Sequence, residues 1–141
     1  MTVLAAVNGE YEEDRVVSTA FDLAGAYEER LVVLHVMSNE EFADRQNATP
    51  EYFLENAEQT ARNVARRVTR GTLGGVGDIE FRGEVGPVAE TVLDVAQELD
   101  VTYLVIDGRG RSAVGKALFG SKTQTLLMDA ERPVVSVTQG D

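Results

Sequence analysis

The order of short apolar runs along this chain limits the folds it can adopt more than any other feature. Three runs are nearly continuous in apolar side chains: Thr2–Val7, Leu31–Met37 and Tyr103–Ile106. Such runs are typical of strands buried on both faces. Asp78–Glu84 is more polar and alternates, as expected at a sheet edge. Val134–Thr138 follows Pro133, which a strand tolerates at its first residues. We therefore predict five strands.

Segments with apolar residues at helical spacing separate these strands. Four helices are expected: Glu10–Glu28, Thr49–Arg70, Gly86–Leu99 and Ser121–Ala130. The first begins with acids that favour the positive end of the helix dipole. The second begins with Thr49 as N-cap and Pro50 as the first helical residue. The polar stretch Ser38–Thr49 is expected to be irregular, and whether it covers a ligand stays open. Gly71–Gly77 is expected to be a flexible turn.

Strand and helix alternate four times before a closing strand, which favours the α/β class. Right-handed crossovers then produce a single domain over residues 1–141. Its core is a doubly wound, five-stranded parallel sheet with helices on both faces. Ligands bind such sheets beyond the carboxyl ends of the strands, at the point where the strand order reverses. The loops expected there are Asn8–Glu10, Val36–Asn39 and Asp107–Ser121.

The chain has no cysteine and one histidine, which excludes several kinds of site. Disulfides, thiol catalysis, cysteine-based clusters and multi-histidine metal centres all lack their ligands. His35 lies in an apolar strand and is expected to be a hydrogen-bonded structural residue, with no nucleophile–base pair elsewhere. The N-terminus lacks the basic region of a signal peptide. No apolar stretch approaches the ~20 residues of a membrane span, so we expect a cytoplasmic protein without membrane contact.

The net charge of −11 argues against nucleic acid as a partner, because phosphate repulsion would have to be overcome locally. The chain has two lysines against eleven arginines and 24 acids. Dense surface carboxylate with little lysine is a composition we associate with a halophile, whose proteins work in concentrated salt that screens self-repulsion. An ordinary acidic cytoplasmic protein is the alternative.

The segment from Gly108 to Met128 is an exception in this acidic chain. It holds no acid and four cations: Arg109, Arg111, Lys116 and Lys122. Its glycines let the backbone approach a phosphate, and Ser121 stands where it would cap the next helix. A strand that leads through glycines into a helix start builds phosphate cradles, so we expect an anionic ligand here. A glycine-rich turn without a ligand is the alternative.

Gly110–Lys116 reads GRSAVGK and matches the Walker A spacing up to its lysine. Ala117 stands where that motif needs Ser or Thr to bind Mg²⁺. The loop also follows the fourth expected strand rather than the first. A P-loop hydrolase is therefore the least supported hypothesis for this chain.

The layout and the loop resemble the universal stress protein family. The family's nucleotide motif is Gly, two residues, Gly, nine residues, Gly and then Ser or Thr. Its last part is intact here from Gly110 to Gly120-Ser121. RGRS and LFGS in the loop, LVVLHV in the second strand and RPVVSV in the fifth also look like the family. The resemblance covers essentially the whole chain. It implies a flavodoxin-like, adenine nucleotide alpha hydrolase-like fold and a regulatory stress-response protein with slow hydrolysis at most.

By this resemblance the ligand is ATP, or ADP or AMP, alone or with Mg²⁺ or Mn²⁺. The residues implied at the nucleotide are Asn8, Val36, Asp107, Gly108, Gly110, Arg111, Gly120 and Ser121. Backbone amides of Gly110, Gly120 and Ser121 would hold phosphates, and Val36 would pack on the base. Asn8 and Asp107 would approach the ribose or a metal ion. The resemblance also implies a homodimer that pairs through Val134–Thr138.

Two positions depart from the family's ATP-binding pattern. Asp107 stands where the motif has its first glycine, and Asn8 stands where members usually carry an acid. A carboxylate roughly 4 Å from an anionic ligand group costs about 1 to 4 kcal/mol, depending on screening. These two residues motivate a second hypothesis, a family member that has lost ATP binding and works as a dimeric interaction module.

Overall fold

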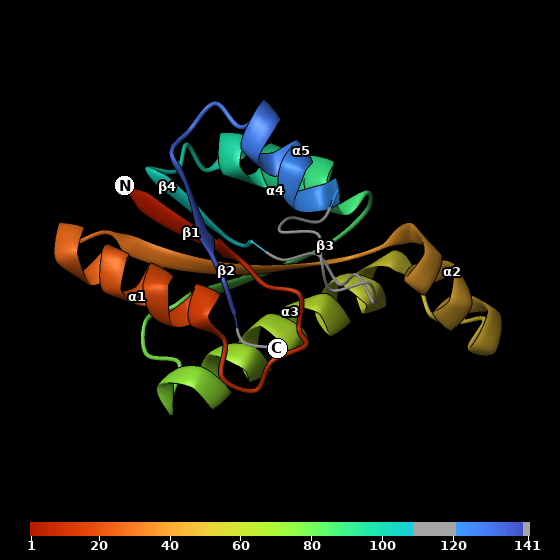
Figure 1. Cartoon of the computed structure of the whole chain (residues 1–141). Helices are drawn as coiled ribbons and strands as arrows, with labels where there is room; N and C mark the ends of the chain where they lie inside the picture. The colour runs from red at the N-terminus through yellow and green to blue at the C-terminus, as the bar shows by residue number, and fades with distance from the viewer. Residues whose placement is uncertain (109–120, 140–141) are drawn as a thin grey trace.

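The chain folds around a parallel sheet that lies between two layers of helices (Figure 1). The computed structural model describes residues 1–108 and 121–139. The strands are β1 (Thr2–Ala6), β2 (Arg30–Met37), β3 (Glu80–Val85), β4 (Tyr103–Asp107) and β5 (Val134–Val137). The helices are α1 (Arg15–Tyr27), α2 (Asn39–Ala48), α3 (Leu54–Leu73), α4 (Val88–Glu98) and α5 (Ser121–Asp129).

The strand order is β3-β2-β1-β4-β5, and each neighbouring pair is parallel. α1 and α3 cover one face of the sheet, and α4 and α5 cover the other (Figure 1). The predicted α/β fold with a doubly wound, five-stranded parallel sheet is confirmed. The order reverses between β1 and β4, so the carboxyl ends of these two strands form the switch point.

The central strands bury side chains on both faces of the sheet. In β1, Val3 and Ala5 pack against the α1/α3 layer while Leu4 packs against the α4/α5 layer. In β4, Val105 faces the first layer and Ile106 the second. Successive side chains of a strand point to opposite faces. A strand covered on both sides therefore needs an unbroken apolar run, which is the pattern that predicted β1, β2 and β4.

The polar strand β3 lies at one edge of the sheet, as its alternation predicted. Helix α3 packs so closely on it that a Cβ at Gly83 would overlap the Glu58 carbonyl and the Arg62 amide. Glycine at this position is what allows the helix to lie against the strand. Next to it, Arg82 bonds the carboxylate of Glu98 at 2.9 Å.

The expectation of an irregular stretch at 38–49 is wrong, because this stretch forms helix α2. Ser38 caps the helix by accepting a hydrogen bond from the Glu41 amide at 3.1 Å. Glu41 and Arg45 add an i,i+4 ion pair at 2.9 Å. No residue of α2 is buried. The helix therefore has no apolar stripe, which is the signal from which the other helices were predicted.

The predicted start of the next helix at Thr49-Pro50 is also wrong. Helix α3 begins at Leu54, after a turn in which the Tyr52 amide donates to the Thr49 carbonyl. The Asn56 side chain accepts a hydrogen bond from the Phe53 amide at 2.9 Å and so caps the first turn. Proline preceded by a hydroxyl residue is a helix-start signal by composition alone, and here it belongs to the turn before the helix.

Two other boundaries differ from the predictions. The helix expected over Glu10–Glu28 begins at Arg15, so the acids before it lie in a loop and Asp14 alone caps the helix. The flexible turn expected over Gly71–Gly77 is shorter, because α3 continues to Leu73 and ends at Gly74 with a φ of +80°. Both errors concern helix ends, which periodicity locates poorly.

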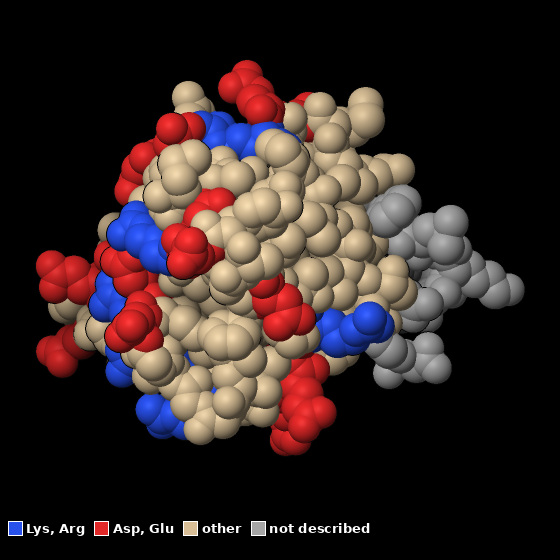
Figure 2. All heavy atoms as spheres, turned by 90° about the vertical axis from the view of Figure 1, so that its left-hand side faces the viewer, with Lys and Arg blue, Asp and Glu red and all other residues tan. Residues whose placement is uncertain are grey.

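Acidic and basic side chains are interspersed over part of the surface, and an uncharged area lies beside them (Figure 2). An exposed example is the Arg30–Glu80 pair at 2.7 Å, of a kind that contributes about 0–1 kcal/mol to stability.

Among the residues described, no helix is both long enough and apolar enough to cross a bilayer.

Candidate functional site

A pocket lies at the switch point of the sheet. Its volume is about 240 Å³, and it opens at the carboxyl ends of β1, β2 and β4. Pockets that enclose a whole drug-sized ligand usually measure roughly 300–1,000 Å³. The described residues therefore surround room for part of such a ligand. Each of the three predicted loops contributes described residues here: Asn8 and Glu10 after β1, Val36 and Ser38 after β2, and Asp107 at the end of β4.

One wall of the pocket is apolar. Its side chains come from β1, β2, α4, β4 and α5: Ala6, Leu34, Val36, Val88, Val92, Ile106 and Leu126. All seven belong to the core beneath α4 and α5 or pack against it. Val36 is 6% exposed and stands at the end of β2, in the wall where the family resemblance put it. A flat apolar ring could pack against this wall without displacing a polar group.

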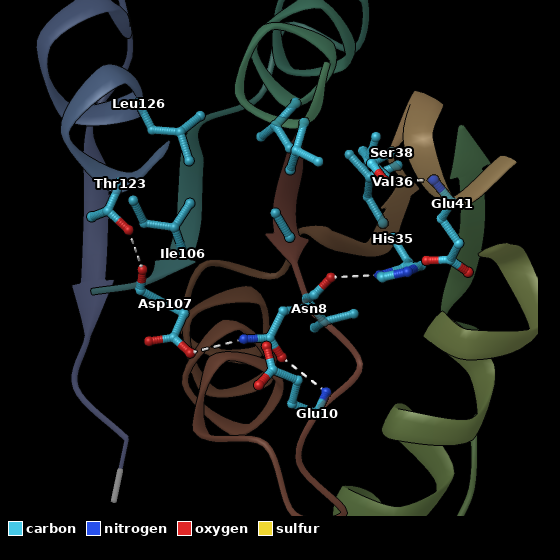
Figure 3. A pocket seen from close by; sticks show the side chains of 15 residues that line it. Asn8, Glu10, His35, Val36, Ser38, Glu41, Ile106, Asp107, Thr123 and Leu126 are labelled. Carbon is cyan, nitrogen blue, oxygen red and sulfur yellow. Dashed lines mark hydrogen bonds between the residues drawn. The ribbon is translucent and has the colours of Figure 1, made fainter. Parts of the chain in front are cut away.

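The rim of the pocket is polar (Figure 3). Its side chains come from the strand ends and from α2 and α5: Asn8, Glu10, His35, Ser38, Glu41, Asp107 and Thr123. Three of the seven are carboxylates, and the lining within residues 1–108 and 123–139 includes no lysine or arginine. Cations for an anionic ligand group would therefore have to come from outside this described lining. Ser38 and Glu41 were not predicted, because the helix that carries them was missed.

Asn8 holds the end of β1 in place. Its Oδ1 accepts a hydrogen bond from the Glu10 amide at 2.9 Å, and its Nδ2 donates to Asp107 Oδ2 at 3.3 Å. Gly9 follows with a φ of +83°, in the left-handed region that glycine adopts readily. Both polar atoms of the Asn8 side chain are thus engaged within the protein.

Asp107 ends β4, and its side chain points to the α1 side of the sheet, the same side as Val105. Ile106, between them, points to the pocket wall on the α4/α5 side. The Asp107 carboxylate accepts hydrogen bonds at Oδ2 from Asn8 and, at 3.2 Å, from Gln139 Nε2. Figure 3 shows this carboxylate turned toward Asn8. The family motif has glycine here, but in this chain the amides of Asn8 and Gln139 both donate to one oxygen of the side chain.

A buried polar cluster lies behind Asp107, at the start of α1. Asp14 is 1% exposed and Gln139 is 2% exposed. Asp14 Oδ1 accepts hydrogen bonds from the Val16 amide at 2.8 Å and from Gln139 Nε2 at 3.0 Å. Burial raises the pKa of Asp14 above its usual value, and the nearby charge of Asp107 raises it further. A helix N-cap could be foreseen from sequence, but no pattern identified Gln139.

Two backbone contacts tie the end of β4 to its neighbours. The Thr123 hydroxyl of α5 donates to the Asp107 carbonyl at 2.9 Å. The Gly108 amide donates to the Val137 carbonyl at 2.8 Å and so extends the pairing of β4 with β5. This amide is therefore used in the sheet, and the assignment of Gly108 to the nucleotide site stays a prediction.

His35 lies on the rim and is a structural group, as its place in an apolar strand predicted. Its Nδ1 is 2.9 Å from the carbonyl of Val7. Because a carbonyl oxygen only accepts, Nδ1 carries the proton and Nε2 is the acceptor. Burial lowers the pKa of His35. The ring is therefore a neutral part of the rim at pH 7 that braces the end of β1 against β2.

The remaining predicted residues lie in the loop after β4. Gly110, Arg111 and Gly120 lie outside the described residues, as does the GRSAVGK segment. Ser121 is the first residue of α5, which places the start of a helix next along the chain from the expected phosphate loop. The described part of the chain thus brings together Asn8, Val36 and Asp107 at one pocket.

Comparison with known proteins agrees with this fold. The sequence model of the universal stress protein family matches residues 1–138. The chain belongs to the universal stress protein family. A universal stress protein of Mycolicibacterium smegmatis is 28% identical over 144 residues, which cover 99% of this chain and 48% of that protein. The chain thus spans about half the length of this curated relative.

Solved structures of universal stress proteins share the architecture. One, in complex with cAMP, is 22% identical with a TM-score of 0.66 and covers 99% of this chain and 98% of its own. Another, from Archaeoglobus fulgidus, is 19% identical with a TM-score of 0.63 and covers 96% of this chain and 92% of its own. At such identities the likeness establishes the fold.

Proposed function

We propose that this universal stress protein binds an adenine nucleotide, ATP or its ADP or AMP products, as a regulatory ligand. The observation that carries the proposal is the pocket at the switch point, with an apolar wall that includes Val36. The sequence of the loop from β4 to α5 is a second support for the proposal, because it has the family's spacing between Gly110 and Gly120-Ser121. The relative in complex with cAMP supports an adenine ligand in this fold.

In this proposal the base packs on the apolar wall and the phosphates extend toward the loop after β4. Gly110, Gly120 and Ser121 would offer backbone amides, and Arg111 would add charge. Asn8 is a weaker ligand for Mg²⁺ or Mn²⁺ than a carboxylate, because its side chain is uncharged and its Oδ1 already accepts one hydrogen bond from the Glu10 amide. No nucleophile–base pair is evident in the sequence, which supports a regulatory role with slow hydrolysis at most.

The decisive experiment is to denature the purified protein and identify any released nucleotide by mass spectrometry. Titration calorimetry with ATP, ADP and AMP, with and without Mg²⁺ or Mn²⁺, follows in low and in molar salt. Ala6→Leu should fill part of the pocket and lower affinity by roughly 5- to 150-fold, since overpacking a formed site costs about 1–3 kcal/mol. Ala26→Leu, on the exposed face of α1, is the matched control. No released nucleotide and no heat of binding would overturn the proposal.

The second candidate is a universal stress protein that binds no nucleotide and acts as an interaction module. The three carboxylates at the rim, Glu10, Glu41 and Asp107, favour it, because each disfavours a phosphate nearby. The same titrations separate the two candidates, since an empty pocket that stays empty with ATP and either metal ion supports the module.

For either candidate we propose a homodimer that pairs through the C-terminal strand. β5 lies at the edge of the sheet, and the carbonyls of Pro133 and Val137 bond to β4. Because alternate residues of a strand turn their polar groups to opposite sides, the exposed Ser136 turns its amide outward. Ser136→Pro should remove that donor and shift the protein toward monomer by light scattering, whereas Ser136→Ala should not. A monodisperse wild-type monomer at micromolar concentration would contradict the dimer.

A further inference from the structure

Gln139 lies just beyond β5, 32 residues after Asp107, yet its side chain contacts the entrance of the nucleotide loop. Its amide nitrogen donates to Asp107 Oδ2 at 3.2 Å and to Asp14 Oδ1 at 3.0 Å. Its Oε1 accepts from the Arg15 amide at 2.9 Å. Each side-chain donor and acceptor of Gln139 therefore has a partner, and the side chain is 2% exposed.

The orientation of this amide is determined by its partners. Carboxylates only accept hydrogen bonds, and a backbone amide only donates. A flipped Gln139 would turn its oxygen toward Asp14 and Asp107 and its nitrogen toward the Arg15 amide, so three contacts would become repulsive. The segment that carries Gln139 is also held in place, because Arg15 Nη1 donates to the Thr138 carbonyl at 2.8 Å.

This contact matters because Asp107 has two possible surroundings at the switch point. Asp107 lines the rim of the pocket, and its Oδ2 meets the polar cluster at the start of α1. Gln139 and Asn8 both approach the same oxygen of Asp107 and hold it toward the cluster. A hydrogen bond between a neutral amide and a carboxylate stabilises the charge where it stands.

We propose that Gln139 is a positioning residue that holds the Asp107 carboxylate on the α1 side of the sheet, away from the phosphates of a bound nucleotide. This inference rests on the proposed nucleotide site and explains how the site accepts an acid where the family motif has glycine. The segment after β5 then influences nucleotide affinity without touching the nucleotide.

The first test is a cycle of ATP affinities over wild type, Gln139→Ala, Asp107→Asn and the double variant. Gln139→Ala should lower affinity roughly tenfold in the wild-type background, the size expected when a hydrogen bond to a charged group is lost. In the Asp107→Asn background, Gln139→Ala should lower affinity less than about twofold, because residue 107 then carries no negative charge for Gln139 to position. Equal losses in both backgrounds would show a merely structural role and overturn the proposal.

Two further variants sharpen this cycle. Gln139→Glu has the same shape but replaces the shared donor by a third carboxylate, so it should weaken binding more than Gln139→Ala. Thr138→Ala changes the exposed neighbouring side chain and should leave affinity unchanged. A Gln139→Glu variant that binds ATP as tightly as wild type contradicts the proposal.

The second test needs no nucleotide and therefore separates this inference from the proposed function. The charge of Asp107 contributes to the raised pKa of Asp14, whose other close partners are the amides of Val16, Val17 and Gln139. By carboxyl ¹³C NMR, Asp107→Asn should lower the pKa of Asp14 while Gln139 is present and much less in Gln139→Ala. The same lowering in both backgrounds would show that Asp107 stays in place without Gln139, and the proposal would fail even if ATP binds.

Discussion

The two sides of the sheet differ sharply at the same switch point. On the α4/α5 side the strand ends present an apolar wall that includes Val36 and Ile106. On the α1 side they meet a buried polar cluster of Asn8, Asp14, Asp107 and Gln139 (Asp107 and Asn8 in Figure 3). The wall offers a surface on which a ring can pack, whereas in the cluster amides donate to one oxygen of each of two nearby carboxylates. The difference shows how one strand can serve two purposes, because consecutive residues face opposite ways.

The wall should respond most strongly to truncation. Ile106→Ala removes a side chain that is 1% exposed, and we expect a loss of about 2–5 kcal/mol in the free energy of unfolding. Urea unfolding followed by circular dichroism measures it. Leu127→Ala, on the partly exposed side of α5, is the control and should cost less than 1 kcal/mol or so. A similar loss for both would mean that Ile106 is not part of a packed wall.

The stability that the polar cluster contributes should depend more on the hydrogen-bond acceptor at Asp14 than on the charge of Asp14. Asp14→Ala removes the cap of α1 and leaves the Val16 amide and Gln139 without their acceptor, at a cost of about 1–2 kcal/mol. Asp14→Asn keeps an acceptor at the cap and should cost clearly less. Urea unfolding measures the free energy of unfolding of both variants. A larger loss for Asp14→Asn than for Asp14→Ala would show that the negative charge itself stabilises the cluster.

The contact that joins the two sides should have a smaller effect. Thr123→Val keeps the buried shape but removes the hydrogen bond to the Asp107 carbonyl, and we expect a loss of about 1 kcal/mol. Thr123→Ser keeps the hydroxyl and serves as the control for that bond. If the valine variant is as stable as wild type, the bond between α5 and the end of β4 contributes nothing measurable.

The pH dependence of the free energy of unfolding reports on one carboxyl of the cluster, that of Asp14. We expect this to be the smallest of the four effects. Because the pKa of Asp14 is raised above its ordinary value of 3.8, the folded state holds this proton more tightly than the unfolded chain. The wild type should therefore lose stability relative to Asp14→Asn as pH rises from below 3.8 through the raised pKa, and the difference should then stay constant. Unfolding of both variants at stepped pH tests the sign, and the opposite trend would mean that the charged form is favoured.

Most of the fold could be predicted because burial imposes a pattern on the strands. β1, β2 and β4 are covered on both faces, so their residues are apolar at consecutive positions. Helix α2 could not be predicted in this way, because none of its residues is buried. Its contacts are the Ser38 cap, the pair of Glu41 with Arg45, and the partly buried Phe42, which packs near Met37. The starts of α1 and α3 were misplaced because composition favours several capping positions, and only packing selects one.

The candidate site was predictable in its position and only partly in its chemistry. The reversal of strand order and the family resemblance together indicated Asn8, Val36 and Asp107, and these three line one pocket. The direction of the Asp107 side chain was not predictable, nor were its partners. Gln139 is one polar residue in a polar tail, and nothing in its sequence neighbourhood marks it as buried.

The sequence by itself determined the alternation of strands and helices, and with it the parallel sheet and the location of the edge at which we propose that a ligand binds. Periodicity is a local property, so it can be seen without knowledge of the rest of the chain. Only the tertiary structure decided that Asp107 faces the start of α1 and shares the amide of Gln139 with Asp14. Those contacts join residues 32 and 125 positions apart, and a hydrogen bond between such distant residues exists only once the strands have been placed side by side.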